Sequence, residues 1–316
     1  MTTEAQAFPQ AAPRGLGAAR PRWGERIIEA SLLGCALLSV VITIGIVFAL
    51  LEPSIEFFGD VSLKEFFTGK EWAPLFKPPS FGVAPLVVGT LVTTFWALVV
   101  CIPFGLGAAI WLSEYAHPKA RATLKPTLEV LAGVPTVVYG FFALTFITPR
   151  LQEIWPGFLG DPPQVFNALA AGLVMGIMIL PTVASLSEDA MSAVPAGLRE
   201  GALALGGSRM QVATRVVVPA ALSGIVASFV LAISRGVGET MIVLIAAGLK
   251  PNTSLNPTEA HQTMTGFIGQ AGIGDLSTGS TGYKTIFAVG ATLFVATFVM
   301  NMLSIRLVRK YRQVYE

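Results

Sequence analysis

Two ionisable residues, Arg235 and Glu239, stand inside a long apolar run over residues 216–249. On a continuous helix, side chains four residues apart share a face, so these two could pair. A charge within the hydrocarbon region costs at least about 2.5–3.5 kcal/mol, which argues against unpaired exposure to lipid. One interpretation is a structural ion pair that holds helices together. In the other, Arg235 lines a water-filled path and meets an anion, while Glu239 positions it or restores charge balance. Gly236 and Gly238 favour the second interpretation, because they open space or let a neighbouring helix approach.

A proline stands between glycines in another apolar run, in the segment GVPTVVYG of residues 133–140. Pro135 frees a backbone carbonyl, and freed backbone at membrane depth is tolerated where it faces protein or a water-filled cavity. Thr136 and Tyr139 could hydrogen-bond there and line a substrate path. The alternative is that Pro135 only kinks the helix for packing, and the residue types favour this alternative over a substrate path.

Four further acidic residues flank the apolar runs, namely Glu114, Glu129, Glu188 and Asp189. We expect Glu114 at the end of the second run, and Glu188 and Asp189 at the end of the fourth, to be solvated. Glu129 follows Lys125 closely in the sequence, and we expect it to pair with a lysine or arginine at the interface.

A loop between the fourth and fifth apolar runs carries a regularly spaced pattern. Its members are Glu200, Gly201, Ala202, Gly206, Val216, Val218 and Pro219. The pattern resembles the EAA motif of ABC importer permeases, E-A-A-x3-G-x9-I-x-L-P, with the same spacing throughout. It departs from the motif at Gly201, Val216 and Val218, which replace Ala, Ile and Leu. Small residues let a short helix seat closely in a groove, Gly206 permits a sharp turn, and Pro219 begins the next helix. In that family the loop forms the coupling helix that inserts into the ATPase subunit; an ordinary Ala/Gly-rich connector is the alternative.

The residues of a catalytic or nucleotide site are missing from the sequence. The pair Gly69–Lys70 has Lys64 where a phosphate-binding loop requires its first glycine. The two histidines, His117 and His261, are far apart, which argues against a histidine metal site or a Ser/His triad. We therefore expect no enzyme activity, metal or cofactor in this chain, and ATP and Mg²⁺ would be used by a partner ATPase.

The composition indicates a membrane protein. Apolar residues make up 53% of the 316 residues and charged residues 13%, whereas soluble domains carry about 25% charge. Cys35 and Cys101 lie in apolar stretches and match no metal spacing. We therefore expect both cysteines to be small apolar residues of the core. A net charge of +2 gives no indication of nucleic-acid binding. A soluble enzyme and a secreted mini-protein are excluded.

Six apolar runs have the length of about 20 residues that a spanning helix needs. They cover Ile27–Leu51, Ala84–Leu112, Thr127–Ile147, Val165–Leu186, Val216–Leu249 and Lys284–Leu307. The fifth is too long for one straight span, so we expect its first residues at the membrane interface. The sequence therefore predicts an all-α membrane protein with six transmembrane helices.

Basic residues are unevenly shared between the two sides of these spans. The tails and the second and fourth loops hold 14 Lys and Arg, against six in the other loops. The positive-inside rule then places both termini in the cytoplasm. The predicted parts are a disordered cytoplasmic tail, a first span, an external loop long enough for a short interfacial helix, a core of five spans and a cytoplasmic tail. Their ranges are 1–26, 27–51, 52–83, 84–307 and 308–316.

Beyond residue 27 the chain resembles the PstC family of phosphate-specific permeases, the transmembrane subunits of a type I ABC importer with the MetI-like fold. Four stretches carry the resemblance: SFGVAPLVVGTLVTTFWALVVCIPFGLGAAIWLSEYA, LEVLAGVPTVVYGFFAL, the EAA-like loop and SRGVGETMIVLIAAG. The long first external loop favours PstC over its partner permease family, PstA.

The resemblance implies that this chain forms half of a path for importing inorganic phosphate across the cell membrane. It implies a PstA-like second permease, a PstB-like ATPase dimer and a PstS-like phosphate-binding protein as partners. An Arg and a Glu implicated in transport in that family correspond by motif to Arg235 and Glu239. Two alternatives stay open: a permease for sulfate, molybdate or tungstate, because one arginine does not discriminate tetrahedral anions, and an ion-driven secondary carrier.

Overall fold

The computed structural model describes residues 23–274 and 276–311. The chain divides into two compact units, Met1–Ala49 and Leu50–Glu316. Most of the tail predicted over residues 1–26, and the end of the tail predicted over 308–316, lie outside the described residues.

The first unit contains most of one long helix, α1 (Trp23–Asp60), which includes the first predicted span. Its most apolar window has a mean hydropathy of 2.7, and none of that window is buried by other parts of the chain. A helix with apolar residues around its whole circumference is stable where lipid covers it. Cys35 is exposed here, so the expectation of a core position was wrong for this cysteine. Residues 23–26, assigned to the tail from the sequence, are helical.

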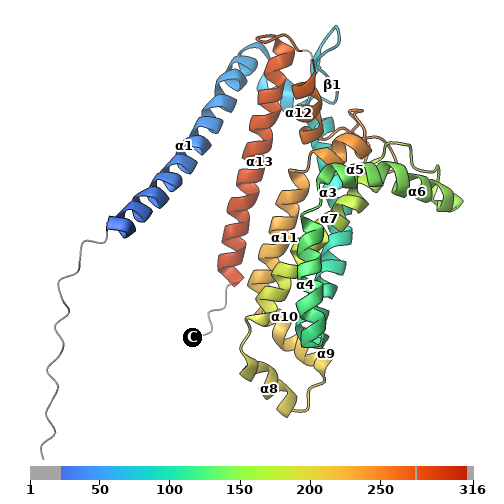
Figure 1. Cartoon of the computed structure of the whole chain (residues 1–316). Coiled ribbons are helices and arrows are strands. Elements are labelled where there is room, and N and C mark those ends of the chain that lie inside the picture. The colour runs from blue at the N-terminus through green and yellow to red at the C-terminus, as the bar shows by residue number, and fades with distance from the viewer. Residues whose placement is uncertain (1–22, 275, 312–316) are drawn as a thin grey trace, which may run out of the picture. The chain divides into compact units, whose positions relative to one another are not determined.

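The elements of the predicted external loop lie at one end of the second unit (Figure 1). Their buried apolar side chains, several of them aromatic, form a cluster with residues of the last two helices. The last turns of α1 pass the predicted boundary because Phe57 is buried in this cluster. Edge-to-face rings, a favourable arrangement for aromatic pairs, join Phe57 to Phe66 and Trp72 to Phe267. The expected short helix is present as α2. The elements here are α2 (Leu63–Thr68), the antiparallel strands β1 (Trp72–Ala73) and β2 (Ser80–Phe81), α12 (Met264–Ile273) and α13 (Thr281–Tyr311).

The transmembrane core consists of α3, α7 and α11, which pack side by side in the second unit. The helix bounds are α3 (Ala84–Ile110), α7 (Ala168–Ser192) and α11 (Leu222–Val237). Small and medium apolar side chains fill the contact, among them Ala97, Ala171 and Met175, all fully buried. Cys101 belongs to the same cluster, which confirms its predicted core position.

Two predicted spans are bent sharply. The third is divided into α4 (Pro118–Ala132) and the segment Thr136–Ile154, which meet at an angle of 86°. Pro135 stands at this break and has no amide to continue the helical hydrogen bonds. The fifth is divided at Ala221 with an angle of 73°, so residues before α11 run in a different direction, as their predicted interfacial position requires.

Short elements complete the second unit. Near the third span they are the π-helical turn η1 (Trp111–Tyr115), α4 (Pro118–Ala132), α5 (Thr136–Phe142), η2 (Ala143–Ile147), α6 (Thr148–Ile154) and η3 (Gly157–Leu159). Around the EAA-like loop and the fifth span they are α8 (Ala196–Ala204), α9 (Arg209–Val212), η4 (Ala213–Val217), α10 (Val218–Ala220) and η5 (Val243–Ala247).

The described chain has four helices long and apolar enough to cross a membrane, or six when each bent pair is one span. Each predicted span has a counterpart among them. Within the second unit, α8 and α9 lie at one end and β1 and α12 at the other (Figure 1). This separation agrees with the predicted loop sides, whereas the cytoplasmic position of the termini stays a prediction.

Candidate functional site

Arg235 lies in the last turn of α11 and is half-buried against α7. Its Nη1 donates to Thr182 Oγ1 at 3.1 Å, and its Nη2 lies 3.8 Å from the sulfur of Met178. These two partners are four residues apart on α7 and so share one face of that helix. Both partners are neutral. No ion pair in the described chain includes Arg235.

Glu239 lies beyond the end of α11 and is 8% exposed. Its Oε1 accepts hydrogen bonds from the amides of Met241 at 3.0 Å and Ile242 at 3.2 Å. The carboxylate therefore caps the start of the short helical segment that leads into η5, where helix amides favour a negative charge. Its backbone carbonyl accepts from Thr265 Oγ1 at 2.6 Å.

The predicted pairing of Arg235 with Glu239 was wrong. The prediction assumed one continuous helix, but α11 ends at Val237 with Gly238 as its C-cap. The chain then leaves the helical path, so the i, i+4 spacing of a continuous helix does not apply to this pair. Within the described residues no ion pair joins the two side chains.

Gly236 lets α11 approach α3 closely. A Cβ atom at this position would stand 3.1 Å from Cγ2 of Thr94, tighter than ordinary contact. This agrees with the expectation that a glycine here lets a neighbouring helix approach. Thr94 is 4% exposed, and its Oγ1 has no hydrogen-bond partner in the described chain.

A set of buried hydroxyl groups surrounds the break after α11, and sequence reasoning missed it. Thr265 reaches the Glu239 carbonyl, contacts Thr263 at 3.2 Å, and lies beside the Met264 amide, which donates to Thr90 Oγ1 at 3.0 Å. The helical spacing of Thr90, Thr93 and Thr94 in a very apolar run was the available signal. Thr182 had no signal of its own, because its role depends on Arg235.

Tyr139 and Thr136, the other predicted path residues, lie in α5 after the 86° break. The Tyr139 hydroxyl donates to the Leu131 carbonyl at 3.1 Å. In a continuous helix that carbonyl would accept a hydrogen bond from the amide of residue 135, but residue 135 is a proline and has no amide hydrogen. The Val134 amide also donates to this carbonyl, at 3.3 Å, so the Tyr139 hydroxyl is one of two donors at the break, in agreement with the expectation that Tyr139 could hydrogen-bond there. Neither side chain hydrogen-bonds Arg235 or Glu239 in the described chain.

Glu188, expected to be solvated, is fully buried in an ion cluster between α4 and α7. Arg121 contacts its Oε1, Lys125 Nζ lies 2.8 Å from its Oε2, and Ser192 Oγ donates to Oε1 at 2.7 Å. Asp189 also contacts Lys125 and is 56% exposed, so its expected solvation agrees with the structure.

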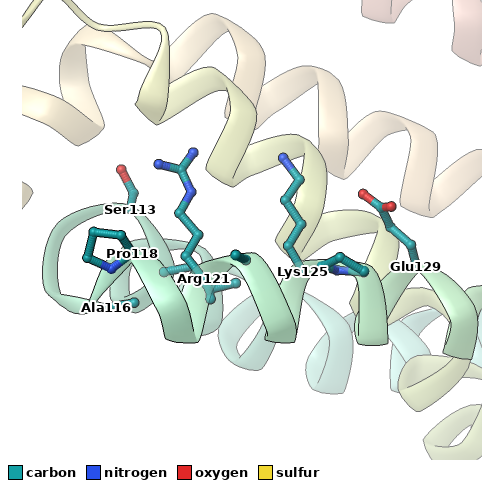
Figure 2. Close-up of a pocket in the computed structure, with 9 residues that line it drawn as sticks. Ser113, Ala116, Pro118, Arg121, Lys125 and Glu129 are labelled. Atoms are coloured by element: carbon teal, nitrogen blue, oxygen red, sulfur yellow. The ribbon is translucent and has the colours of Figure 1, made fainter.

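A cavity of about 670 Å³ adjoins this cluster. Figure 2 shows Arg121, Lys125 and Glu129 projecting from the same side of α4 towards it. The expected ion pair of Glu129 is absent among the described residues. The nearby lysine and arginine bind Glu188 instead, which removes the partners that the sequence suggested.

Glu114, also expected to be solvated, is 9% exposed and lies 3.2 Å from Nε of Arg199 in α8. The expectation failed because η1 places this carboxylate against the loop that follows α7. Ser113 donates a second hydrogen bond to it at 2.9 Å.

The EAA-like loop folds into the short helix α8, a turn, and α9. Glu200, Gly201 and Ala202 lie within α8, and Gly206 has a φ of 85°, which L residues with a side chain rarely adopt. The expectation that Pro219 begins the next helix was wrong: it lies near the end of the helical segment Arg209–Ala220, and α11 begins at Leu222, after the break at Ala221. Leu203 and Leu205 are exposed on or beside α8 by 47% and 91%.

A protein-family model matches most of the sequence that forms these elements. The model for binding-protein-dependent transport system inner membrane components covers residues 101–313. The chain belongs to this family. It is thus a multi-pass membrane protein with the architecture of an ABC transporter permease.

Curated members of the family match most of the chain. The probable ABC transporter permease protein YqgH of Bacillus subtilis is 33% identical, over 89% of this chain and 88% of its own length. The phosphate transport system permease protein PstC of Mesorhizobium japonicum is 29% identical over 87% of each chain. PstC 1 of Mycobacterium bovis is 33% identical, over 81% of this chain and 85% of its own length.

Solved family structures share the fold. A bacterial alginate ABC transporter superposes with a TM-score of 0.62, at 15% identity over 90% of this chain and 95% of the other. The inward-facing MetNI methionine ABC transporter gives a TM-score of 0.52, at 20% identity over 73% and 95%. At these identities the likeness shows the MetI-like permease fold alone.

Proposed function

We propose that this chain is one of two transmembrane subunits of an ATP-driven importer of inorganic phosphate. The relatives named PstC that match more than four fifths of the chain support this substrate. The observation that carries the proposal is Arg235, a guanidinium inside a spanning segment whose partners are neutral.

The geometry suits a transient anion site. A guanidinium presents a planar fork that binds phosphate through two parallel hydrogen bonds. Thr182 and Met178 supply neutral acceptors, and an anion binds the guanidinium more strongly because it adds the attraction of opposite charges and can accept two parallel hydrogen bonds. Glu239 binds backbone amides and so does not compete for the guanidinium.

Buried hydroxyl groups next to the break can replace part of the hydration shell of the anion. Thr94 lies at the contact of α3 with α11, and its Oγ1 is free to hydrogen-bond. One arginine with neutral neighbours binds weakly, and weak binding permits release on the far side. Selectivity then resides in a phosphate-binding protein of the PstS type outside the membrane.

The energy comes from a partner of the PstB type, which binds ATP and Mg²⁺. Helix α8 with its exposed Leu203 and Leu205 is the surface that docks on this ATPase. A second permease of the PstA type completes the path. In this proposal both termini are cytoplasmic, because the basic loops lie on that side.

The test is uptake of radiolabelled phosphate by proteoliposomes that contain this chain, the second permease, the ATPase and the binding protein. We expect uptake that requires ATP and the binding protein and that excess sulfate, molybdate or tungstate leaves unchanged. Uptake without ATP would contradict the ABC mechanism, and inhibition by sulfate would contradict the substrate.

A further inference from the structure

Arg199 joins three separate parts of the chain through one guanidinium. It lies in α8, next to Glu200. Its Nε lies 3.2 Å from Glu114 Oε1, its Nη1 donates to the Val194 carbonyl at 2.6 Å, and its Nη2 donates to the Met191 carbonyl at 2.6 Å. Three acceptors in three directions use the planar fork of arginine in a way that a lysine cannot reproduce.

One of these acceptors is the carbonyl of Met191 in the last turn of α7, and another is the carbonyl of Val194, two residues beyond the end of α7 at Ser192. The last carbonyls of a helix have no amide partner within the helix, and the helix dipole favours a positive charge there. Arg199 supplies both the donors and the charge. The side chain of a residue in α8 thus caps α7.

The third acceptor, Glu114, belongs to η1, the turn that continues α3. Its side chain is 9% exposed and that of Arg199 is 22% exposed, so water screens the pair only in part. Removal of either member would leave a charge that is mostly buried without a partner. The pair therefore resists separation, and α8 stays attached to the ends of both α3 and α7.

The same helix α7 carries the partners of Arg235. Thr182 is about 14 Å from Met191 along the helix, at a rise of about 1.5 Å per residue. The intervening Val183, Ala184 and Ser187 are fully buried, so this part of α7 is packed against its neighbours. A displacement of α8 that carries the end of α7 must also move Thr182 relative to α11.

We propose that Arg199 is a positioning residue that transmits the movement of α8 to α3 and α7, and so to the Thr182 contact of Arg235. The proposal rests on the proposed function, because it requires an ATPase that moves α8. The quantity to measure is the number of anions imported per ATP hydrolysed.

The experiment uses the complete transporter in proteoliposomes and compares Arg199→Lys with the wild type. Lysine keeps the charge but loses the fork, so we expect ATP hydrolysis to continue while uptake per ATP falls by roughly 5- to 150-fold, the usual range of coupling between sites. Arg215→Lys is the matched control, because the Arg215 side chain is exposed in the same loop and makes no hydrogen bond or ion pair in the described chain. Its ratio should equal that of the wild type.

Glu114→Gln is the second variant, because it keeps an oxygen acceptor and removes only the charge. We expect a smaller fall in the same ratio, and the double variant should lose less than the product of the single effects, as expected for residues in contact. An unchanged ratio in an assembled Arg199→Lys complex would overturn the proposal. If that variant fails to co-purify with the ATPase, an unchanged ratio for Glu114→Gln overturns it equally.

Failure of the proposed function is separable from failure of this inference. A wild-type complex without ATP-driven phosphate uptake contradicts the proposed function. A wild type that imports phosphate, with variants whose uptake per ATP is normal, contradicts the role of Arg199 alone.

Discussion

Arg235 and Glu239 lie on either side of a helix end and bind different partners, although only four residues separate them in the sequence. The guanidinium contacts Thr182 and Met178 on α7. The carboxylate accepts from the amides of Met241 and Ile242. Among the described residues the arginine therefore has no charged partner, which is the condition an anion site needs.

The capping role of Glu239 separates two substitutions. Glu239→Gln keeps an oxygen that can accept from the amides, so we expect an assembled complex with part of its uptake. Glu239→Leu removes the cap, and loss of a cap costs roughly 0.5–2 kcal/mol. We expect a lower thermal midpoint for the leucine variant in detergent. If the carboxylate acted as the counter-ion of Arg235, glutamine would be as damaging as leucine, and equal uptake losses would contradict the cap.

Gly236 should tolerate no larger residue unless Thr94 is reduced. An added Cβ would stand 3.1 Å from Thr94 Cγ2, and overpacking of this kind costs about 1–3 kcal/mol. We expect Gly236→Ala to lower the yield of assembled complex and Thr94→Ser, which removes that methyl group, to restore it. Size-exclusion yields of the single and double variants test this. A double variant no better than Gly236→Ala would contradict the close approach.

Substitutions at Gly206 should act through the backbone conformation and not through steric clashes of the new side chain. Its φ is 85°, and a Cβ atom added there would meet no neighbouring atom within 4 Å. A left-handed conformation costs an L residue roughly 1–2 kcal/mol, least for asparagine. We expect Gly206→Ala, and more so Gly206→Arg, to reduce uptake per ATP, with Gly206→Asn closest to the wild type. Equal ratios in all three would show that the turn plays no part in coupling.

Glu188 and its neighbour Asp189 offer a matched pair for the buried ion cluster. Glu188 is fully buried between Arg121 and Lys125, and breaking a buried ion pair costs about 3–5 kcal/mol. We expect Glu188→Leu to lower the thermal midpoint strongly. Asp189 is 56% exposed, so Asp189→Asn should change stability by less than about 1 kcal/mol. Similar midpoints for the two variants would contradict the assignment of the buried charge.

The sequence predicted those features that depend on neighbouring residues. Apolar runs located the four long spanning helices and the two bent pairs, and Pro135 indicated where the third span changes direction. The φ of Gly206 and the short helix α8 were expected from the spacing of the EAA-like loop.

Features that depend on residues far apart in the chain were missed. Lys125 reaches Glu188 across 63 positions, and Arg199 reaches Glu114 across 85. Glu188 and Glu114 lie near expected helix ends, so the sequence suggested that water surrounds both carboxylates. In the folded chain a lysine or an arginine from a distant part of the sequence binds them instead. The Arg235–Glu239 error had a local cause: a helix pattern was continued through Gly238, where the helix stops.

The most direct test of the anion site is ATP-driven phosphate uptake by Arg235→Ala complexes beside Arg150→Ala complexes. Arg150 is 62% exposed and pairs with Glu153 on the surface, so it controls for the loss of one arginine. We expect the Arg235 variant to assemble with its partners and to lose uptake by about one to two orders of magnitude, the value of hydrogen bonds to a charged group. The Arg150 variant should transport as the wild type does. Normal uptake by the Arg235 variant would contradict the central role of this residue.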